Sequence, residues 1–115
     1  MFTELQINGK VYKLRLRTMD VVQLEKKLDH NIMDMFMGIN NDKLPQLREI
    51  LAVLQAALNA YHHGMKEREV YELYDEYLAD GHTMFDLIPV VVELMQNGGI
   101  IPKDQVEEKE EKEEE

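Results

Sequence analysis

The longest uninterrupted helical pattern in the chain covers residues 44–64, LPQLREILAVLQAALNAYHHG. Its large apolar side chains recur every three or four positions and therefore share one stripe of an α-helix. Alanines widen this apolar arc, so we expect neighbours to pack on more than one side. Pro45 suits the first helical turn, and Gly64 suits the position just past the end. The pattern predicts a central helix whose inward stripe is Leu47, Ile50, Leu51, Leu54, Leu58 and Tyr61.

Two alternating runs within residues 2–16 flank Asn8-Gly9, a dipeptide that readily adopts positive φ at both positions of a tight turn. We therefore predict a β-hairpin. Because an isolated hairpin is marginally stable in water, its apolar face must dock on the helices or pair with another chain. Arg15 and Arg17 at its end either protect the edge or bind a partner. The turn sets the facing pairs Leu5/Tyr12, Thr3/Leu14, Met1/Leu16, Glu4/Lys13 and Gln6/Val11.

Apolar spacing and end signals predict further helices on both sides of the central one. They are 19–29 with Thr18 as N-cap, a short piece 32–37 capped by Asn31 and stopped by Gly38, 67–80 ended by Gly81, and a last helix opened by His82-Thr83 and ended by Gly98-Gly99. We expect Ile100-Ile101 to pack back on the core. The side chains expected to face inward on the last two helices are Val70, Leu73, Tyr74, Tyr77, Leu78, Phe85, Leu87, Ile88, Val91, Val92, Leu94 and Met95.

The start of the last helix carries two further signals. Thr83 and Asp86 have the spacing of a capping box. Pro89 is too far from Thr83 to belong to the first turn, so we expect it to remove one helical hydrogen bond and to produce a kink or a restart near residues 87–89.

These elements predict a mainly α fold, with four to five helices and an N-terminal hairpin (about 2–16) in a single domain over residues 1–103. Residues 104–115 form a Glu/Lys tail with too little apolar content to fold alone, so we expect disorder there. The final nine residues, EEKEEKEEE, carry net charge −5 of the chain's −10. Without a basic block to neutralise phosphates, nucleic-acid binding is not expected.

Composition also restricts the chemistry. The chain of 115 residues has no cysteine and no serine, which removes disulfides, thiolate metal sites and the usual hydrolase nucleophiles. The start has no signal-peptide pattern, and no run approaches the roughly 18 apolar residues of a membrane span. We therefore expect a protein of the cytoplasm that neither catalyses a reaction nor enters a membrane.

Histidines and acidic residues offer only weak metal-site patterns. His62, His63 and His82 fall near predicted helix ends, where the helix dipole alone favours them, and no His-x-x-x-His spacing supports a metal site. The thioethers of the Met33-x-Met35-x-Met37 pattern suit monovalent copper, but neither a cysteine nor a histidine pair accompanies them. We therefore expect no metal and no cofactor.

Two apolar clusters are candidates for contact with a protein partner. The segment 32–39 has only one charged residue, and all of its apolar side chains cannot face one core from two helical turns. Either most of them fill one end of the core, as methionine does well, or they form a contact patch. On the helix 67–80, tyrosines at three-residue spacing either cover the core edge or form a binding ridge. The candidate partner-binding residues are Met33, Met35, Phe36, Met37, Tyr71 and Tyr77.

Several segments resemble one known protein family. They are Glu4–Lys10 (ELQINGK), Tyr12–Leu16 (YKLRL), Leu24–Leu28 (LEKKL), Tyr71–Tyr77 (YELYDEY) and Gly81–Pro89 (GHTMFDLIP). Together they are similar to the tail assembly chaperones of long-tailed, siphovirus-type phages that infect Gram-positive hosts. The similarity covers residues 2–102 and consists of structural motifs without a catalytic constellation.

The resemblance implies a non-enzymatic role in virion morphogenesis. A member of that family coats the tape measure protein, keeps it soluble and helps to recruit tail tube subunits. It acts in the host cytoplasm as an oligomer and is absent from the mature virion. The resemblance also implies a longer, frameshifted product that carries a tube-recruiting domain. Two other interpretations stay open from the residues: a helical adaptor or regulatory protein that binds one partner, and a small metal-dependent enzyme.

Overall fold

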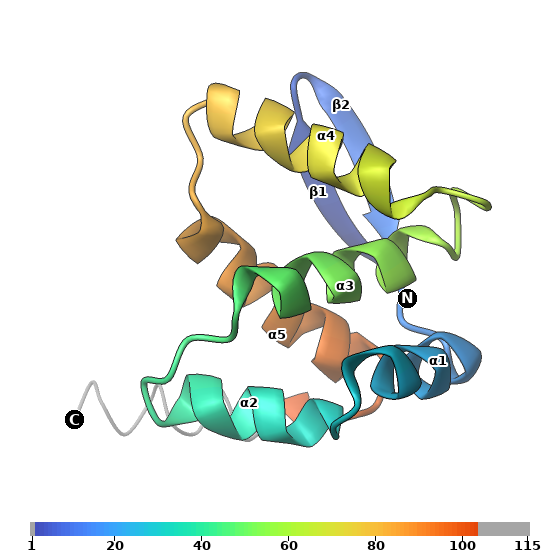
Figure 1. Cartoon of the computed structure of the whole chain (residues 1–115), viewed down its shortest axis with the longest axis vertical. Helices are drawn as coiled ribbons and strands as arrows, with labels where there is room; N and C mark the ends of the chain where they lie inside the picture. Colours follow the sequence, from blue (N-terminus) through green and yellow to red (C-terminus); the bar gives the residue numbers. More distant parts are fainter. Residues whose placement is uncertain (1, 104–115) are drawn as a thin grey trace.

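The computed structural model describes residues 2–103 and shows a small α-helical domain with an N-terminal hairpin (Figure 1). The predicted fold class, a mainly α domain of four to five helices with an N-terminal hairpin, is confirmed, and the described residues form five helices. The disorder expected for residues 104–115 and the pairing of Met1 with Leu16 lie outside the described residues. The elements are β1 (Thr3–Ile7), β2 (Lys10–Leu14), α1 (Thr18–Leu28), α2 (Ile32–Asn40), α3 (Leu47–Leu58), α4 (Glu67–Ala79), a 3-10 turn (Met84–Asp86) and α5 (Leu87–Asn97).

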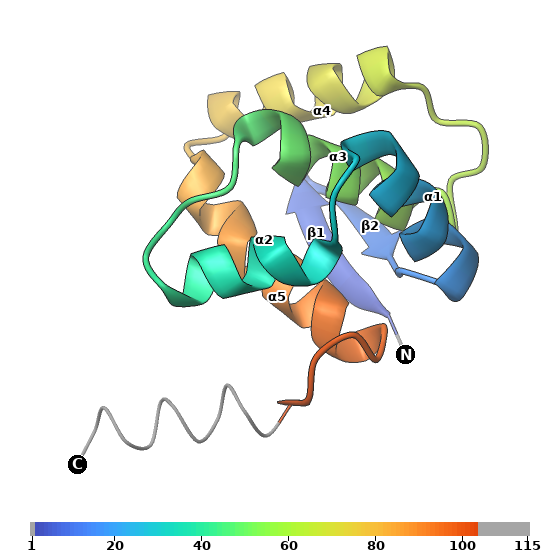
Figure 2. The same ribbon diagram turned by 60° about the horizontal axis from the view of Figure 1, so that its bottom comes forward.

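Helix α3 is the centre of the domain, as its sequence predicts. It packs against α1, α4, α5 and β2, and Figures 1 and 2 show it between α4 on one side and α1 with α2 on the other. Ile50 and Val53 are fully buried, and Leu54 is 4% exposed. Burial on more than one side of the helix is what its wide apolar arc predicts.

The predicted ends of this helix are wrong by several residues. It begins at Leu47, with Gln46 as the N-cap residue, so Pro45 precedes the helix instead of occupying its first turn. It ends at Leu58, so Gly64, with φ +77°, belongs to the connection to α4. Leu47 and Tyr61, at the two ends of the predicted stripe, are about 40% exposed because the packed neighbours do not extend over them.

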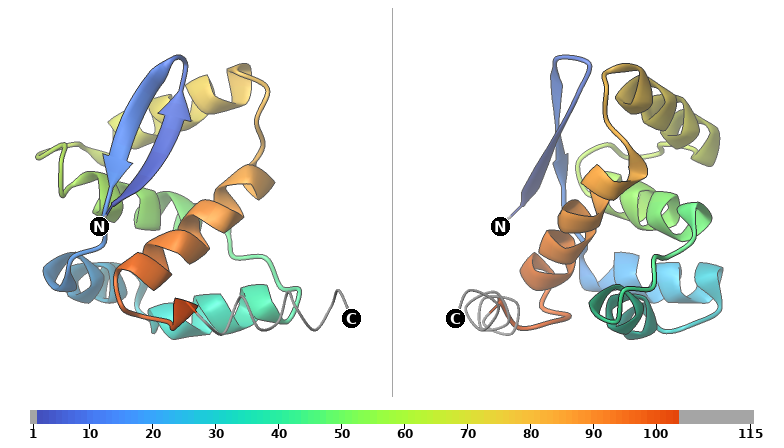
Figure 3. Two further views of the ribbon diagram at one scale, coloured as in Figure 1. Left: turned by 180° about the vertical axis from the view of Figure 1, so that it is seen from behind. Right: turned by 90° about the vertical axis from the view of Figure 1, so that its left-hand side faces the viewer.

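The hairpin has the predicted register. Thr3 pairs with Leu14 and Leu5 with Tyr12; Asn8 and Gly9 have φ of 51° and 80°, which a two-residue turn that matches the strand twist requires. Thr3, Leu5, Ile7 and Leu14 are buried against the helices, and the Asn97 side chain donates a hydrogen bond to the Thr3 hydroxyl (3.0 Å). The hairpin thus docks on the helical body (Figure 3).

The first two helices differ from prediction in how they begin or end. The N-cap of α1 is Arg17 instead of Thr18. The carboxylate of Asp20, which is 2% exposed, accepts hydrogen bonds from the Arg17 backbone (3.1 Å) and guanidinium (2.8 Å). Hydrogen bonding to Asp20 raises the pKa of Arg17. Asn31 caps α2 as predicted, by accepting from the Met33 N–H (2.7 Å), but α2 continues through Gly38 to Asn40.

The C-terminal part contains the predicted restart. Thr83 N–H donates to Asp86 (2.9 Å), and a 3-10 turn then leads into α5 at Leu87. Pro89 therefore falls in the first turn of α5, where its missing N–H costs no helical hydrogen bond. The prediction that it removes one is wrong. Leu78 (41% exposed) and Phe85 (63%) also face solvent instead of the core.

The end of the described chain behaves as expected. Helix α5 ends at Asn97 with Gly98 as its C-cap residue. Ile101 is buried, so the segment after the glycines packs back on the core.

Candidate protein-docking surface

The outer stripe of α3 forms the floor of a surface groove, which we call the α3 trough. Ala52 and Ala56 lie one turn apart in the middle of this floor, and their short side chains leave it low at these two positions. The walls come from α1 on one side and from α4 with Met65 on the other. The trough is lined by Leu47, Arg48, Leu51, Ala52, Gln55 and Ala56 of α3 and by its C-cap residue Asn59.

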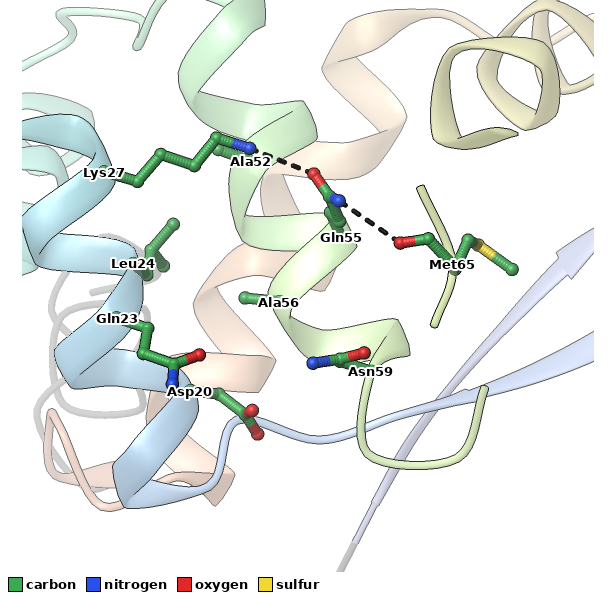
Figure 4. A pocket seen from close by; sticks show the side chains of 9 residues that line it. All are labelled: Asp20, Gln23, Leu24, Lys27, Ala52, Gln55, Ala56, Asn59 and Met65. Carbon is green, nitrogen blue, oxygen red and sulfur yellow. Dashed lines mark hydrogen bonds between the residues drawn. The ribbon is translucent and has the colours of Figure 1, made fainter. Parts of the chain in front are cut away.

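The trough consists of three adjoining hollows of about 180, 140 and 380 Å³. The first two share Lys27, Ala52 and Gln55, and the last two share lining residues from α3 and α4. Figure 4 shows the first hollow, with Leu24 and Lys27 of α1 facing Ala52 and Ala56 of α3. The three hollows therefore lie in a row along α3, and the side chains of Lys27 and Gln55 stand between the first and the second.

A chain of polar contacts crosses the middle of the trough. Lys27 Nζ donates to Gln55 Oε1 (3.0 Å), and Gln55 Nε2 donates to the Met65 carbonyl (3.2 Å; Figure 4). The same ammonium pairs with Glu67 Oε2 at 3.3 Å, so it joins α1 to α4. Both charged side chains are about half exposed. An exposed pair of this kind is weak, so a partner can displace it easily.

Glu67 and Tyr71 fix the α4 wall. The Tyr71 hydroxyl donates to Glu67 Oε1, one helical turn away. This hydrogen bond, followed by the Lys27 ammonium, lowers the pKa of Glu67, and it raises the pKa of Tyr71. The Tyr71 ring is thereby held at the junction of the second and third hollows.

The third hollow is the apolar end of the trough. Leu47, Leu51, Tyr71 and Tyr74 line it, together with Arg48 and Asp75. Leu47 is 39% exposed and Tyr71 is 42% exposed. An apolar floor beside one cationic and one anionic side chain fits an amphipathic protein segment better than a small polar molecule.

The structure separates the six predicted contact residues into two groups. Met35 and Phe36 are buried, since with Ile32 they form the single inward stripe of the short helix α2, and Tyr77 is buried as well. These three do not belong to any surface that a partner meets in this conformation. Met33 is partly buried and Met37 is 49% exposed on α2, whereas Tyr71 lies in the α3 trough. The structure therefore does not bring the six residues together into one patch.

Tyr77 and His82 form a stacked pair at the C-terminal end of α4. Their ring centroids are 4.3 Å apart with an interplanar angle of 14°, and burial raises the pKa of Tyr77. His82 Nδ1 lies 3.5 Å from Asp86. Over residues 2–103, no group of three or more His, Asp or Glu side chains is arranged to hold a metal ion.

The residues that sequence reasoning missed are Ala52, Ala56 and Lys27. The sequence does carry a signal for the first two, since alanines one turn apart on a helix allow a close approach of another backbone. From the sequence alone, Ala56 is interpreted only as part of a wider core arc, and Ala52 is not singled out. These alanines form the floor of a groove only because α1 and α4 pack on either side of α3. That arrangement is tertiary structure, which local sequence patterns do not show.

Comparison with known proteins places the chain in one family. A model described as a family of unknown function (DUF6096) matches residues 3–114. The chain belongs to this family. No curated protein and no solved structure matches the chain. Among the helices of residues 2–103, none is both long and apolar enough to cross a lipid bilayer.

Proposed function

We propose that this protein is a non-enzymatic chaperone of phage tail assembly, and that its α3 trough holds helical segments of the tape measure protein. The observation that carries the proposal is the trough itself, a groove with a small-residue floor and an exposed apolar end at Leu47 and Tyr71. Helix-in-groove binding uses this combination of shape and polarity.

The length of the groove suits a short helical segment. From Leu47 to Asn59 the trough follows α3 for about 18 Å at 1.5 Å per residue, which corresponds to roughly three turns of a bound helix. A long client then needs many copies of a small domain, one for each successive segment. Exposed charges at the rim, such as Arg48 and Asp75, favour a client helix with an apolar stripe between charged flanks.

The identity of the client comes from the resemblance to tail assembly chaperones, to which the segments Glu4–Lys10 and Gly81–Pro89 contribute. On this proposal the protein acts in the host cytoplasm and is absent from the mature virion. A longer frameshifted product recruits tail tube subunits. In the genome, the proposal expects a very long tape-measure-like reading frame just downstream.

Co-expression with the tape measure protein tests the proposal. Ala56→Glu places a charged side chain on the trough floor, and Ala79→Glu makes the same change at an exposed position on α4 outside the trough. We expect the unchanged protein and Ala79→Glu to keep the tape measure protein soluble, and Ala56→Glu to lose this ability while it keeps its melting temperature. If a folded Ala56→Glu variant solubilises the client as well as the other two, the trough is not the client site.

A further inference from the structure

We propose that the outer edge of β2 pairs with the same edge of a second copy of this chain, in antiparallel orientation, to form a four-stranded sheet across a two-fold axis. This inference is independent of the proposed function, since it uses a different face of the molecule from the α3 trough. The hairpin stands at one side of the domain, with the helices on its inner face (Figure 3).

The first observation is an unpaired strand edge. In a hairpin closed by Asn8-Gly9, the pairs Ile7/Lys10 and Leu5/Tyr12 exchange backbone hydrogen bonds, whereas Val11 and Lys13 turn their N–H and C=O groups away from β1. The next outward N–H on this edge, that of Arg15, donates to the Ala57 carbonyl of α3 (3.0 Å). Within residues 2–103, no hydrogen-bond acceptor pairs with the backbone N–H groups of Val11 and Lys13.

The second observation is an exposed apolar side chain on this edge. Val11 is 56% exposed and lies between Lys10 and Tyr12 on β2. Unpaired edges are normally protected by charge or by a covering segment. Lys10 and Lys13 supply some charge on this edge, but the exposed β-branched side chain of Val11 suits a strand that pairs with another.

The third observation is charge complementarity beside the strand. Strand β2 and its extension carry Lys10, Lys13 and Arg15 without an acidic residue. Tyr12 of the same strand shares a hollow of about 220 Å³ with three exposed glutamates of α4, namely Glu69, Glu72 and Glu76. Lys10 lies on the same face of the hairpin as Tyr12, whereas Lys13 and Arg15 lie on the other face. A second copy placed along the β2 edge therefore brings its Lys10 to the side of the sheet that carries the acidic stripe, and the two-fold axis repeats the contact. The surface is therefore complementary to itself.

The β1 edge is less suited to the same role. Glu4 and Gln6 of β1 line a hollow together with Asp80 and His82. Asp80 also accepts a hydrogen bond from the Asn8 N–H (3.3 Å). This edge and its surroundings are thus acidic, and two copies joined through it would bring like charges together.

The register of the proposed sheet follows from the outward backbone groups. An axis at Tyr12 puts Val11 opposite Lys13 of the second copy and Lys13 opposite Val11 of the second copy, so both outward residues of each strand form hydrogen-bonded pairs. An axis at Lys13 would put two ammonium groups opposite each other, which disfavours pairing. An axis at Val11 would put Lys13 opposite Gly9 in the turn of the second copy, so fewer backbone hydrogen bonds would form between the two strands.

Proline substitutions on the two edges provide the first test. Lys13→Pro removes an outward N–H of β2 without affecting a hairpin hydrogen bond, and Gln6→Pro does the same on β1. Sedimentation velocity of the full chain over a concentration series measures association, and circular dichroism checks the fold. We expect the unchanged protein and Gln6→Pro to dimerise and Lys13→Pro to stay monomeric. A monomeric unchanged protein, or a dimer lost only in Gln6→Pro, would overturn the proposal.

Charge changes at Val11 test the register and still decide the question if the proline variants do not fold. Val11→Lys puts an ammonium group opposite Lys13 of the other copy at both symmetry-related contacts, so the affinity of the dimer should fall about tenfold. Val11→Glu puts a carboxylate opposite Lys13 at the same two contacts and should raise the affinity by a similar factor. If both changes weaken the dimer equally, Val11 faces itself and the proposed register is wrong. If neither changes the dissociation constant, the β2 edge is not the interface and the pairing itself is refuted.

Discussion

Replacing Leu54 with alanine tests whether α3 is the structural centre of the domain. Leu54 is 4% exposed, so truncation removes an isopropyl group that is almost fully out of water. At about 0.8 kcal/mol per buried carbon, the transfer term is about 2 kcal/mol, and the cavity that remains brings the expected loss of unfolding free energy to about 2–5 kcal/mol. In a domain of this size, each 1 kcal/mol lowers the melting temperature by about 4–8 °C.

The matched control is Leu47→Ala on the same helix. Leu47 is 39% exposed, so the same truncation should cost only about 1.5 kcal/mol, because part of the side chain is already hydrated and no enclosed cavity remains. Urea unfolding followed by far-UV circular dichroism measures both changes. Equal losses in the two variants, or an unchanged midpoint for Leu54→Ala, would mean that the orientation of α3 is wrong.

Three further predictions concern other parts of the molecule. Asp20→Asn should lower the unfolding free energy by about 1–3 kcal/mol, because the buried carboxylate loses charge-assisted hydrogen bonds at the start of α1; an unchanged urea midpoint would contradict this. Tyr71→Phe should raise the pKa of Glu67 toward its ordinary value, since the hydroxyl that holds it down is gone, and an NMR titration in which that pKa does not move would exclude the hydrogen bond. Met35→Gln should destabilise the domain whereas Met37→Gln should not, because only the first is buried; similar melting temperatures for both would place Met35 on the surface.

The parts of the fold that the sequence predicts well depend on local interactions. The hairpin register follows from one turn, since the conformations of Asn8 and Gly9 fix which residues face each other. The position of Leu54 in the core follows from helical periodicity. The cap of α2 follows from Asn31, whose side chain bonds to a backbone N–H two residues away. None of these requires knowledge of distant segments.

Sequence reasoning also misses some local features, because cap preference and apolar periodicity alone do not decide them. Phe85 is exposed although it is strongly apolar, because the 3-10 turn before α5 points it away from the core. Arg17 caps α1 because Asp20 lies buried at the right distance, although rules of cap preference favour Thr18.

The candidate site was the least accessible to prediction. Tyr71 was among the expected contact residues, but the floor beneath it consists of Ala52 and Ala56, which resemble ordinary helix-forming residues until α1 and α4 are placed beside them. The buried position of Met35 has the same origin, because the face of a short helix that turns inward depends on what it packs against.

The stoichiometry of the complex with the tape measure protein tests the central claim most directly. Native mass spectrometry of the purified, co-expressed complex counts the copies of this chain on each client molecule. A chaperone that uses the α3 trough for successive client helices should give many copies per client, and Ala56→Glu should abolish them while Ala79→Glu leaves them in place. A one-to-one complex, or many copies that persist with Ala56→Glu, would contradict the account.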